Sequence, residues 1–255
     1  MEGALPAAPS RAPVFVDDFS RGVDPLKWVD HYLPHWTVPE RSAARYATTS
    51  SGLELRIESD QLDWREEDAP LRVSNLQTAV FSGAVGSSRG THRHRPDGLE
   101  VRTWTPQRLL FAPSEGRIDL TVAASTDQSC MLAAWLVGTE HLSDADSGEI
   151  CIFEIDADAV ASSTRVRTGI KAHQDPRLTT DMAEITLPFD ASALHTWTVI
   201  WGGGETTIGC EGRVVRRIPQ APDYPMMLLI DLFEIGPPLG RYPKTALVSQ
   251  VSAWD

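Results

Sequence analysis

Residues 147–158 read SGEICIFEIDAD, and polar and apolar side chains alternate along most of this stretch. Such alternation predicts a β-strand, whose successive side chains point to opposite faces of a sheet. Glu149 and Cys151 then share one face, while Glu154 falls out of phase with them. One β-bulge near residues 152–153 restores the phase, and bulges are common beside active sites. We therefore expect one face of a sheet to carry Glu149, Cys151, Glu154 and Asp156.

The same period of two recurs on both sides of this stretch, between turn residues. It is clearest at residues 52–57, 116–122 and 196–201, and further strand-like runs cover residues 131–137, 149–155, 166–173, 206–210, 227–232 and 245–254. Helical periodicity is scarce, so a parallel α/β fold, which needs helices of roughly 10–15 residues between its strands, is disfavoured. Many short strands predict an all-β fold: a two-sheet antiparallel β-sandwich of jelly-roll (concanavalin-like) type.

Composition and charge exclude several classes of partner. The chain has 255 residues, of which 42% are hydrophobic and 23% charged, as expected for a globular protein with a full core. Its 35 acidic residues outnumber 23 basic ones, and the net charge of −12 disfavours nucleic acid and anionic membranes. No apolar run approaches the roughly 18 residues that would span a bilayer. We expect a monomer.

Prolines and glycines are spread along the chain, which favours one domain over residues 14–255. Residues 1–13 are rich in proline and alanine, and we expect them to be disordered. They lack the features of a signal peptide, so a cytoplasmic protein or a trimmed secreted one is expected. The three cysteines have no C-x-x-C spacing, which argues against a disulfide framework or a cysteine-built zinc site.

Two carboxyl groups on one sheet face suit the cleavage of a glycosidic bond. One carboxylate attacks the anomeric carbon, and the other carboxyl protonates the departing oxygen. The alternative from these residues alone is a solvated sheet face in an acidic protein. Another register, with Glu154, Asp156 and Asp158 on one face of an unbulged strand, also stays open.

Several motifs resemble glycoside hydrolase family 16, which includes laminarinases and lichenases. Residues 148–154, GEICIFE, closely resemble the family signature G-E-I-D-I-x-E. Residues 132–137, LAAWLV, are similar to the tryptophan-bearing strand that precedes the catalytic strand. Further landmarks occur in family order from about residue 15 to the end, at residues 17–19, 26–28, 52–55, 195–201, 209–212 and 246–251.

The resemblance implies a retaining, endo-acting glycoside hydrolase or transglycosylase that cleaves a β-glucan with β-1,3 or mixed linkages. Its implied nucleophile is Glu149 and its general acid/base is Glu154. Cys151 stands where the family keeps an aspartate that couples to the nucleophile, and a neutral thiol contributes neither that charge nor a strong hydrogen bond. The alternative is a non-catalytic carbohydrate-binding protein that kept the cleft but lost turnover through Cys151.

Other candidate substrate-binding residues come from the same resemblance. Trp135 would form the cleft floor and stack on a sugar, although a core tryptophan is an equal alternative. His173 would lie near the cleaved bond, although it could also be a structural histidine. Segments containing Trp36, Arg45 and Asn75 would flank the cleft, and a structural role is the simpler expectation for each.

We expect no metal and no cofactor, and a polysaccharide or oligosaccharide as the partner. His92 and His94 would share a strand face, but no nearby cysteine or acidic residue completes a zinc set, so a solvated loop is favoured. Ser249 stands where relatives often have a calcium-binding aspartate. The chain also lacks a phosphate-binding loop and the G-x-S-x-G turn of serine hydrolases.

Overall fold

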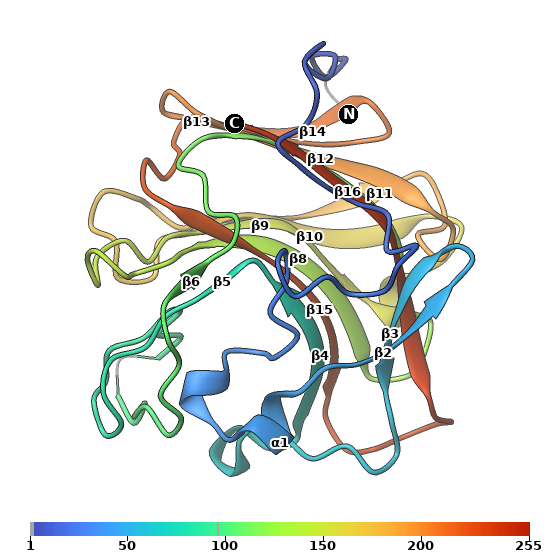
Figure 1. Cartoon of the computed structure of the whole chain (residues 1–255). Helices are drawn as coiled ribbons and strands as arrows, with labels where there is room; N and C mark the ends of the chain where they lie inside the picture. The colour runs from blue at the N-terminus through green and yellow to red at the C-terminus, as the bar shows by residue number, and fades with distance from the viewer. Residues whose placement is uncertain (1–2, 96) are drawn as a thin grey trace.

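Two antiparallel β-sheets pack face to face in the computed structural model, which describes residues 3–95 and 97–255 (Figure 1). One sheet has the order β14-β13-β12-β7-β16-β3-β2, with β1 added on β16. Its strands are β14 (Arg213–Ile218), β13 (Glu205–Cys210), β12 (His195–Gly202), β7 (Gly116–Ala123), β16 (Lys244–Trp254), β3 (Gly52–Ile57), β2 (Arg45–Thr49) and β1 (Phe15–Asp17). The expected all-β sandwich of jelly-roll type is confirmed.

The second sheet carries the candidate site and has the order β11-β10-β9-β8-β15-β4. Its strands are β11 (Asp181–Leu187), β10 (Thr164–Lys171), β9 (Glu149–Asp156), β8 (Cys130–Gly138), β15 (Met226–Ile235) and β4 (Leu71–Gln77). A short separate pair is formed by β5 (Ala79–Val80) and β6 (Arg108–Leu109). Helical turns within the described residues are η1 (Pro34–Trp36), α1 (Pro39–Ser42), η2 (Glu66–Asp68) and η3 (Ala157–Ala159).

The space between the sheets is filled by alternate side chains from both of them. Leu132, Ile150 and Ile230 face this core from the six-stranded sheet and are fully buried. Across the sandwich, the rings of Phe153 and Trp197 lie 4.8 Å apart between centroids. The other side chains of the six-stranded sheet point away from this core, to a surface that we call the outer face.

The β-bulge expected in β9 is confirmed. Trp135 on β8 lies opposite Cys151, but its neighbour Ala134 lies opposite Phe153, so β9 contains one extra residue at this point. The register with β10 shifts at the same place. Two successive side chains of β9 therefore enter the core, and Glu154 returns to the outer face.

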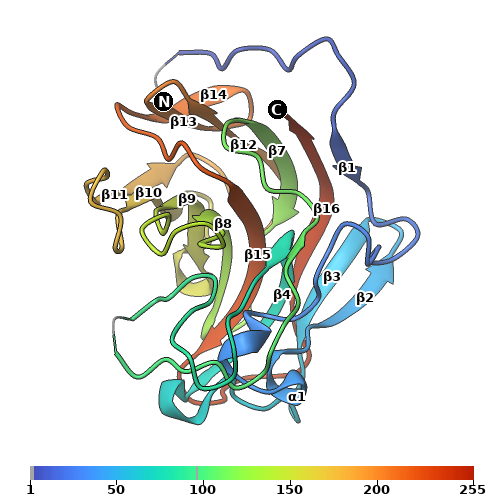
Figure 2. The same cartoon turned by 60° about the vertical axis from the view of Figure 1, so that its left-hand side comes forward.

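A second apolar cluster covers part of the outer face, over β4, β15 and β8. Residues 32–36, Trp64 and residues within 79–101 supply side chains that pack on this part of the sheet, and the chain segments that carry them run over this face (Figure 2). The largest members are Tyr32, Trp36, Trp64, Trp135 and Phe233. Because side chains on both of its faces are buried, β4 shows no simple alternation, and the period of two did not predict it.

The N-terminal segment differs from the expectation of disorder. Residues 3–13 run along the eight-stranded sheet (Figure 2). The backbone N–H of Leu5 donates to the carbonyl of Gly212 at 2.8 Å, and the Trp254 indole donates to the carbonyl of Arg11 at 3.1 Å. Met1 and Glu2, which belong to the same expectation, lie outside the described residues. Across residues 3–95 and 97–255, no helix has the length and apolar character that a membrane crossing requires.

Candidate active site

A cavity of about 190 Å³ opens on the outer face of the six-stranded sheet, next to the second apolar cluster. Strands β8, β9, β10 and β15 supply most of its wall, and three loop residues complete it. The lining residues are Tyr32, His92, Met131, Ala133, Trp135, Glu149, Glu154, Lys171, His173 and Phe233. Four of the residues implied as catalytic or sugar-binding, Trp135, Glu149, Glu154 and His173, are therefore joined here by two polar residues that were not expected, Lys171 and His92.

The bulge brings Glu149 and Glu154 together at this cavity. Glu149 is 3% exposed, and the Glu154 side chain is 17% exposed. Single ligand atoms of Glu149, Cys151 and Glu154 all lie within 4.8 Å of one another. Two carboxyl groups thus share one wall of the cavity at close range.

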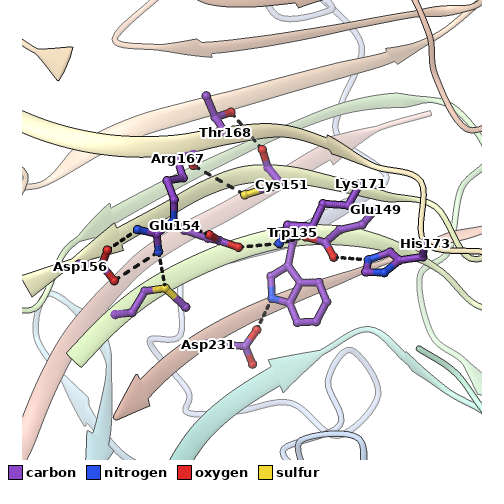
Figure 3. Close-up of polar contacts among 11 residues, drawn as sticks. Trp135, Glu149, Cys151, Glu154, Asp156, Arg167, Thr168, Lys171, His173 and Asp231 are labelled. Carbon is purple, nitrogen blue, oxygen red and sulfur yellow. Dashed lines mark hydrogen bonds and ion pairs between the residues drawn. The ribbon is translucent and has the colours of Figure 1, made fainter. Parts of the chain in front are cut away.

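Lys171, on the paired strand β10, contacts both carboxylates (Figure 3). Its Nζ lies 2.9 Å from Oε1 of Glu149 and donates to Oε1 of Glu154 at 2.7 Å. Burial opposes the charge on Lys171, but the surrounding acidic groups outweigh burial and raise its pKa. Burial likewise opposes ionisation of Glu149, yet the His173 hydrogen bond and the Lys171 charge lower the pKa of that carboxyl. The free site holds an ionised Glu149.

Arg167 connects Glu154 to Asp156. Its Nε donates to Oε2 of Glu154 at 2.9 Å, and its terminal nitrogens bind the Asp156 carboxylate. Asp156 is on the same face as the two glutamates, as the bulge predicted, but it does not line the cavity. Its contact with the site runs through Arg167 (Figure 3).

His173 follows β10 and holds the other oxygen of Glu149. The distance from His173 Nε2 to Glu149 Oε2 is 2.8 Å. Nearby, the Tyr224 hydroxyl donates to Oδ2 of Asp175 at 2.6 Å and accepts the backbone N–H of Gly148 at 2.8 Å. This arrangement fixes the backbone immediately before Glu149, so the glutamate is held at both its main chain and its carboxylate.

Cys151 is fully buried between the two glutamates. Its Sγ lies 3.7 Å from the carbonyl oxygen of Arg167, to which the thiol donates weakly. Burial, with added repulsion from Glu154 and Glu149, raises the pKa of the thiol well above its usual range. The thiol between the two glutamates is therefore neutral, and the positive charge that contacts both of them comes from Lys171.

Trp135 lines the cavity but is only 7% exposed. Its indole N–H donates to Oδ2 of Asp231, and Asn75 donates to Oδ1 of the same carboxyl at 2.7 Å. Burial raises the pKa of Asp231 to about 8; hydrogen bonds from Trp135 and Asn75 oppose this, and the charge of Glu149 adds to it. Trp135 thus combines a cavity-lining position with the buried environment of a core tryptophan.

Three expectations need correction. His92 is not in a solvated loop, since it is 6% exposed and its ring meets Trp135 and His173 at centroid distances of 4.7 and 5.2 Å. Trp36 does not flank the cavity because it is fully buried in the second apolar cluster. Arg45 lies on β2 of the other sheet, where it approaches Asp60 at 3.8 Å.

Two further residues of the site were absent from the sequence-based prediction. Lys171 had a signal, because it is two residues before His173 in the run predicted as a strand and is one of only three lysines. Asp231 had none, because it interrupts an apolar run whose register against β4 and β8 is set by the fold.

The chain resembles solved glycoside hydrolases in fold. It superposes on the GlcNAcα1-4Gal-releasing endo-β-galactosidase of Clostridium perfringens with a TM-score of 0.83 and 21% identity, covering 98% of this chain and 65% of that one. The chain therefore spans about two thirds of that enzyme's length. The laminarinase catalytic domain of Thermotoga petrophila gives a TM-score of 0.66 at 13% identity, covering 95% of this chain and 97% of that one.

The β-glucanase of Bacillus licheniformis gives a TM-score of 0.64 at 14% identity, covering 97% of this chain and 100% of that one. No protein-family model matches the sequence, and no curated protein matches it. The chain has the fold of the family 16 glycoside hydrolases.

Proposed function

We propose that this protein is a retaining, endo-acting glycoside hydrolase or transglycosylase that uses Glu149 as nucleophile and Glu154 as general acid/base. The observation that carries the proposal is the closeness of these two carboxyl groups, whose oxygens lie within 4.8 Å at one cavity wall. Retaining enzymes hold their carboxyl groups about 5–5.5 Å apart, whereas inverting enzymes need about 6.5–9.5 Å to admit a water.

The contacts of each glutamate fit its proposed role. Glu149 is ionised and fixed by His173 and Lys171, as an attacking carboxylate requires. Its attack on the anomeric carbon gives a covalent glycosyl intermediate while Glu154, having taken up a proton from solvent, protonates the departing oxygen. Glu154 then removes a proton from the incoming water or sugar hydroxyl. Because Lys171 and Arg167 bind the two oxygens of Glu154 in the free site, one of these contacts has to break before Glu154 can pass a proton to a substrate oxygen.

Two polysaccharide classes are the candidate substrates. The sequence resemblance favours a β-glucan with β-1,3 or mixed linkages. The overall shape favours a β-galactoside, since the TM-score of 0.83 to the endo-β-galactosidase exceeds 0.66 for the laminarinase domain. We propose β-linked galactosides as the first class to test and β-glucans as the second.

The second candidate function is carbohydrate binding without turnover. The specific observation behind it is the neutral, buried Cys151 together with Lys171 bound to both glutamates. A site in which Lys171 and Arg167 both stay in place cannot protonate a leaving group through Glu154. Sugar binding on the same wall would then be the remaining activity.

Reducing-end release from galactans, laminarin, mixed-linkage glucan and xyloglucan, with affinity measured on the same panel, separates these functions. Turnover with retention of anomeric configuration supports the hydrolase. Transfer products on added acceptor sugars support the transglycosylase. Binding without either product supports the second candidate, and neither binding nor turnover on any β-linked substrate contradicts both.

A further inference from the structure

Three side chains from separate segments meet at one end of the cavity. They are His92 from the loop after β5, Glu149 at the start of β9 and His173 just after β10. One ligand atom of each lies within 4.8 Å of the other two. Two imidazoles and one carboxylate form a ligand set that zinc sites use, with a fourth position left open.

His92 is the member that points to a ligand. His92 is only 6% exposed, and it lines the cavity. Within residues 3–95 and 97–255, no hydrogen bond to either of its ring nitrogens is found, and neither nitrogen is among the enclosed polar atoms that lack a partner, so the ring is open to the cavity. An imidazole nitrogen that lacks a hydrogen-bond partner can present a lone pair to a ligand in the cavity.

We propose that His92, Glu149 and His173 form a binding site for a divalent transition metal of the zinc class. The fourth coordination position faces the cavity and would be filled by water or a sugar hydroxyl. This proposal does not rest on the proposed hydrolase function, because it concerns binding of the metal alone.

The geometry requires only side-chain adjustments. Ligand atoms about 2.0–2.1 Å from a tetrahedral metal lie roughly 3.3 Å from one another. Glu149 Oε2 and His173 Nε2, now 2.8 Å apart, have to separate slightly, and His92 has to close on them. Lys171 contacts the other oxygen, Oε1, so the metal and Lys171 do not need the same atom.

The local charges permit a cation. Lys171 repels a divalent ion, but the carboxylates of Glu149 and Glu154 that contact it carry two negative charges against its one positive charge. Arg167 is likewise offset by Asp156. The other nearby set, formed by Glu149, Cys151 and Glu154, suits a metal less well. Its two carboxylates already bind Lys171, and its thiol is fully buried and does not line the cavity.

A bound metal would block nucleophilic attack by Glu149. The lone pair on Oε2 that the metal takes cannot attack an anomeric carbon, and the ion would also hold His173 away from its present partner. Metal occupancy would therefore compete with glycosidic chemistry in the same cavity, and removal of the ion would restore the free carboxylate.

Titration calorimetry with zinc chloride on chelator-treated protein tests the site. We expect one zinc per chain, and at least about tenfold weaker binding in His92→Phe and in His173→Asn. Phenylalanine keeps the ring beside Trp135, and asparagine tolerates the positive φ of 48° at residue 173. His195→Phe, on β12 of the other sheet, is the matched control and should bind like the wild type.

Cobalt provides a readout that separates the two ligand sets. Cobalt bound by His92, Glu149 and His173 should show visible bands without thiolate-to-metal charge transfer, whereas the set with Cys151 would show that charge transfer. The proposal is overturned if the wild type binds no zinc, if both histidine variants bind it normally, or if the thiolate band appears. Zinc binding that depends on the histidines, in a protein without turnover on any sugar, supports the metal site and contradicts the hydrolase.

Discussion

The Nζ atom of Lys171 lies 2.9 Å from Oε1 of Glu149, across the paired strands β9 and β10. The same ammonium group binds Glu154, while a neutral thiol lies between the two glutamates. Family resemblance leads one to expect three carboxyl groups on this strand. The structure has two carboxylates and a cation instead, so the protonation of the site is set by opposite charges and not by repulsion among like charges.

Removal of that cation should shift the pH dependence of turnover. Lys171 lowers the pKa of Glu149, so Lys171→Met should raise it. A nucleophile is active only when ionised, and activity is lost as pH falls through its pKa. The acidic limb of the pH–kcat/KM profile should therefore move to higher pH in Lys171→Met. Lys27→Met, on the N-terminal side of the chain, is the control, and an unmoved limb would show that Lys171 does not set the ionisation of Glu149.

Glu149→Gln should remove nearly all turnover, because an amide keeps the shape of the carboxylate but cannot attack the anomeric carbon. Oligosaccharide affinity and the folded structure should be largely retained. Hydrolysis assays and binding isotherms on the best substrate of the panel check this. Loss of activity in Asp156 or Asp158 variants, with activity kept in Glu149→Gln, would contradict the role of Glu149 as nucleophile and move the catalytic role to those aspartates.

Cys151→Asp should raise turnover by giving the glutamates a carboxyl partner. It should also lower Tm, since the new group is fully buried and a buried charge is costly even beside Lys171. Product release by Cys151→Ser, wild type and Cys151→Asp should increase in that order, with a changed pH optimum because the carboxyl groups titrate together. No turnover in any of the three, with binding intact, would support the carbohydrate-binding function.

Trp135→Ala should weaken oligosaccharide binding by about 1–3 kcal/mol, as expected for loss of an aromatic contact. Trp135→Phe is the companion variant, because it keeps a ring at the cavity and removes the hydrogen bond to Asp231. Affinity by calorimetry and Tm by circular dichroism should be measured for both. A fall in Tm with unchanged affinity in the folded fraction would assign Trp135 to the core alone.

Asp231 should make the protein less stable as pH rises. Its pKa is about 8 in the folded protein against an ordinary value of 3.8, so between about pH 4 and 8 the folded state holds the extra proton. Stability is then lost as pH increases through this window. Glu140, whose pKa burial also raises to about 8, adds to the same trend.

Between pH 5 and 8, the free energy of unfolding should decrease less in Asp231→Asn than in the wild type. The difference should be about 1–2 kcal/mol, or about 2–8 °C in Tm. The variant can keep its contact with Asn75, because the buried Asn75 Oδ1 has no hydrogen-bond partner among the described residues and can accept after an amide flip. Tm measured across this pH range, with the exposed Asp223→Asn as control, provides the check. Equal slopes in wild type and Asp231→Asn would show that Asp231 is ionised throughout.

The sequence predicted features that depend on one strand and its period. The alternation of polar and apolar residues within segments predicted the sandwich. The break in that alternation before Glu154 predicted the bulge in β9, which places Glu149 and Glu154 on one face. The sequence did not predict contacts that depend on how segments meet. His92 is in a loop whose composition is polar, and its burial arises only because that loop folds back over Trp135. Asp231 reaches the site through the register of β15 with its two neighbours.

The second apolar cluster gives the cleft a wall with its own packing, separate from the main core. The six-stranded sheet lies between the two, so a substitution at Tyr32 or Trp64 changes the shape of the wall without opening a hole between the sheets. Stability of the sandwich and width of the cleft are thus under separate control. The loops can therefore change in sequence while the scaffold persists, which fits a chain that shares its fold with another protein at a TM-score of 0.83 and 21% identity.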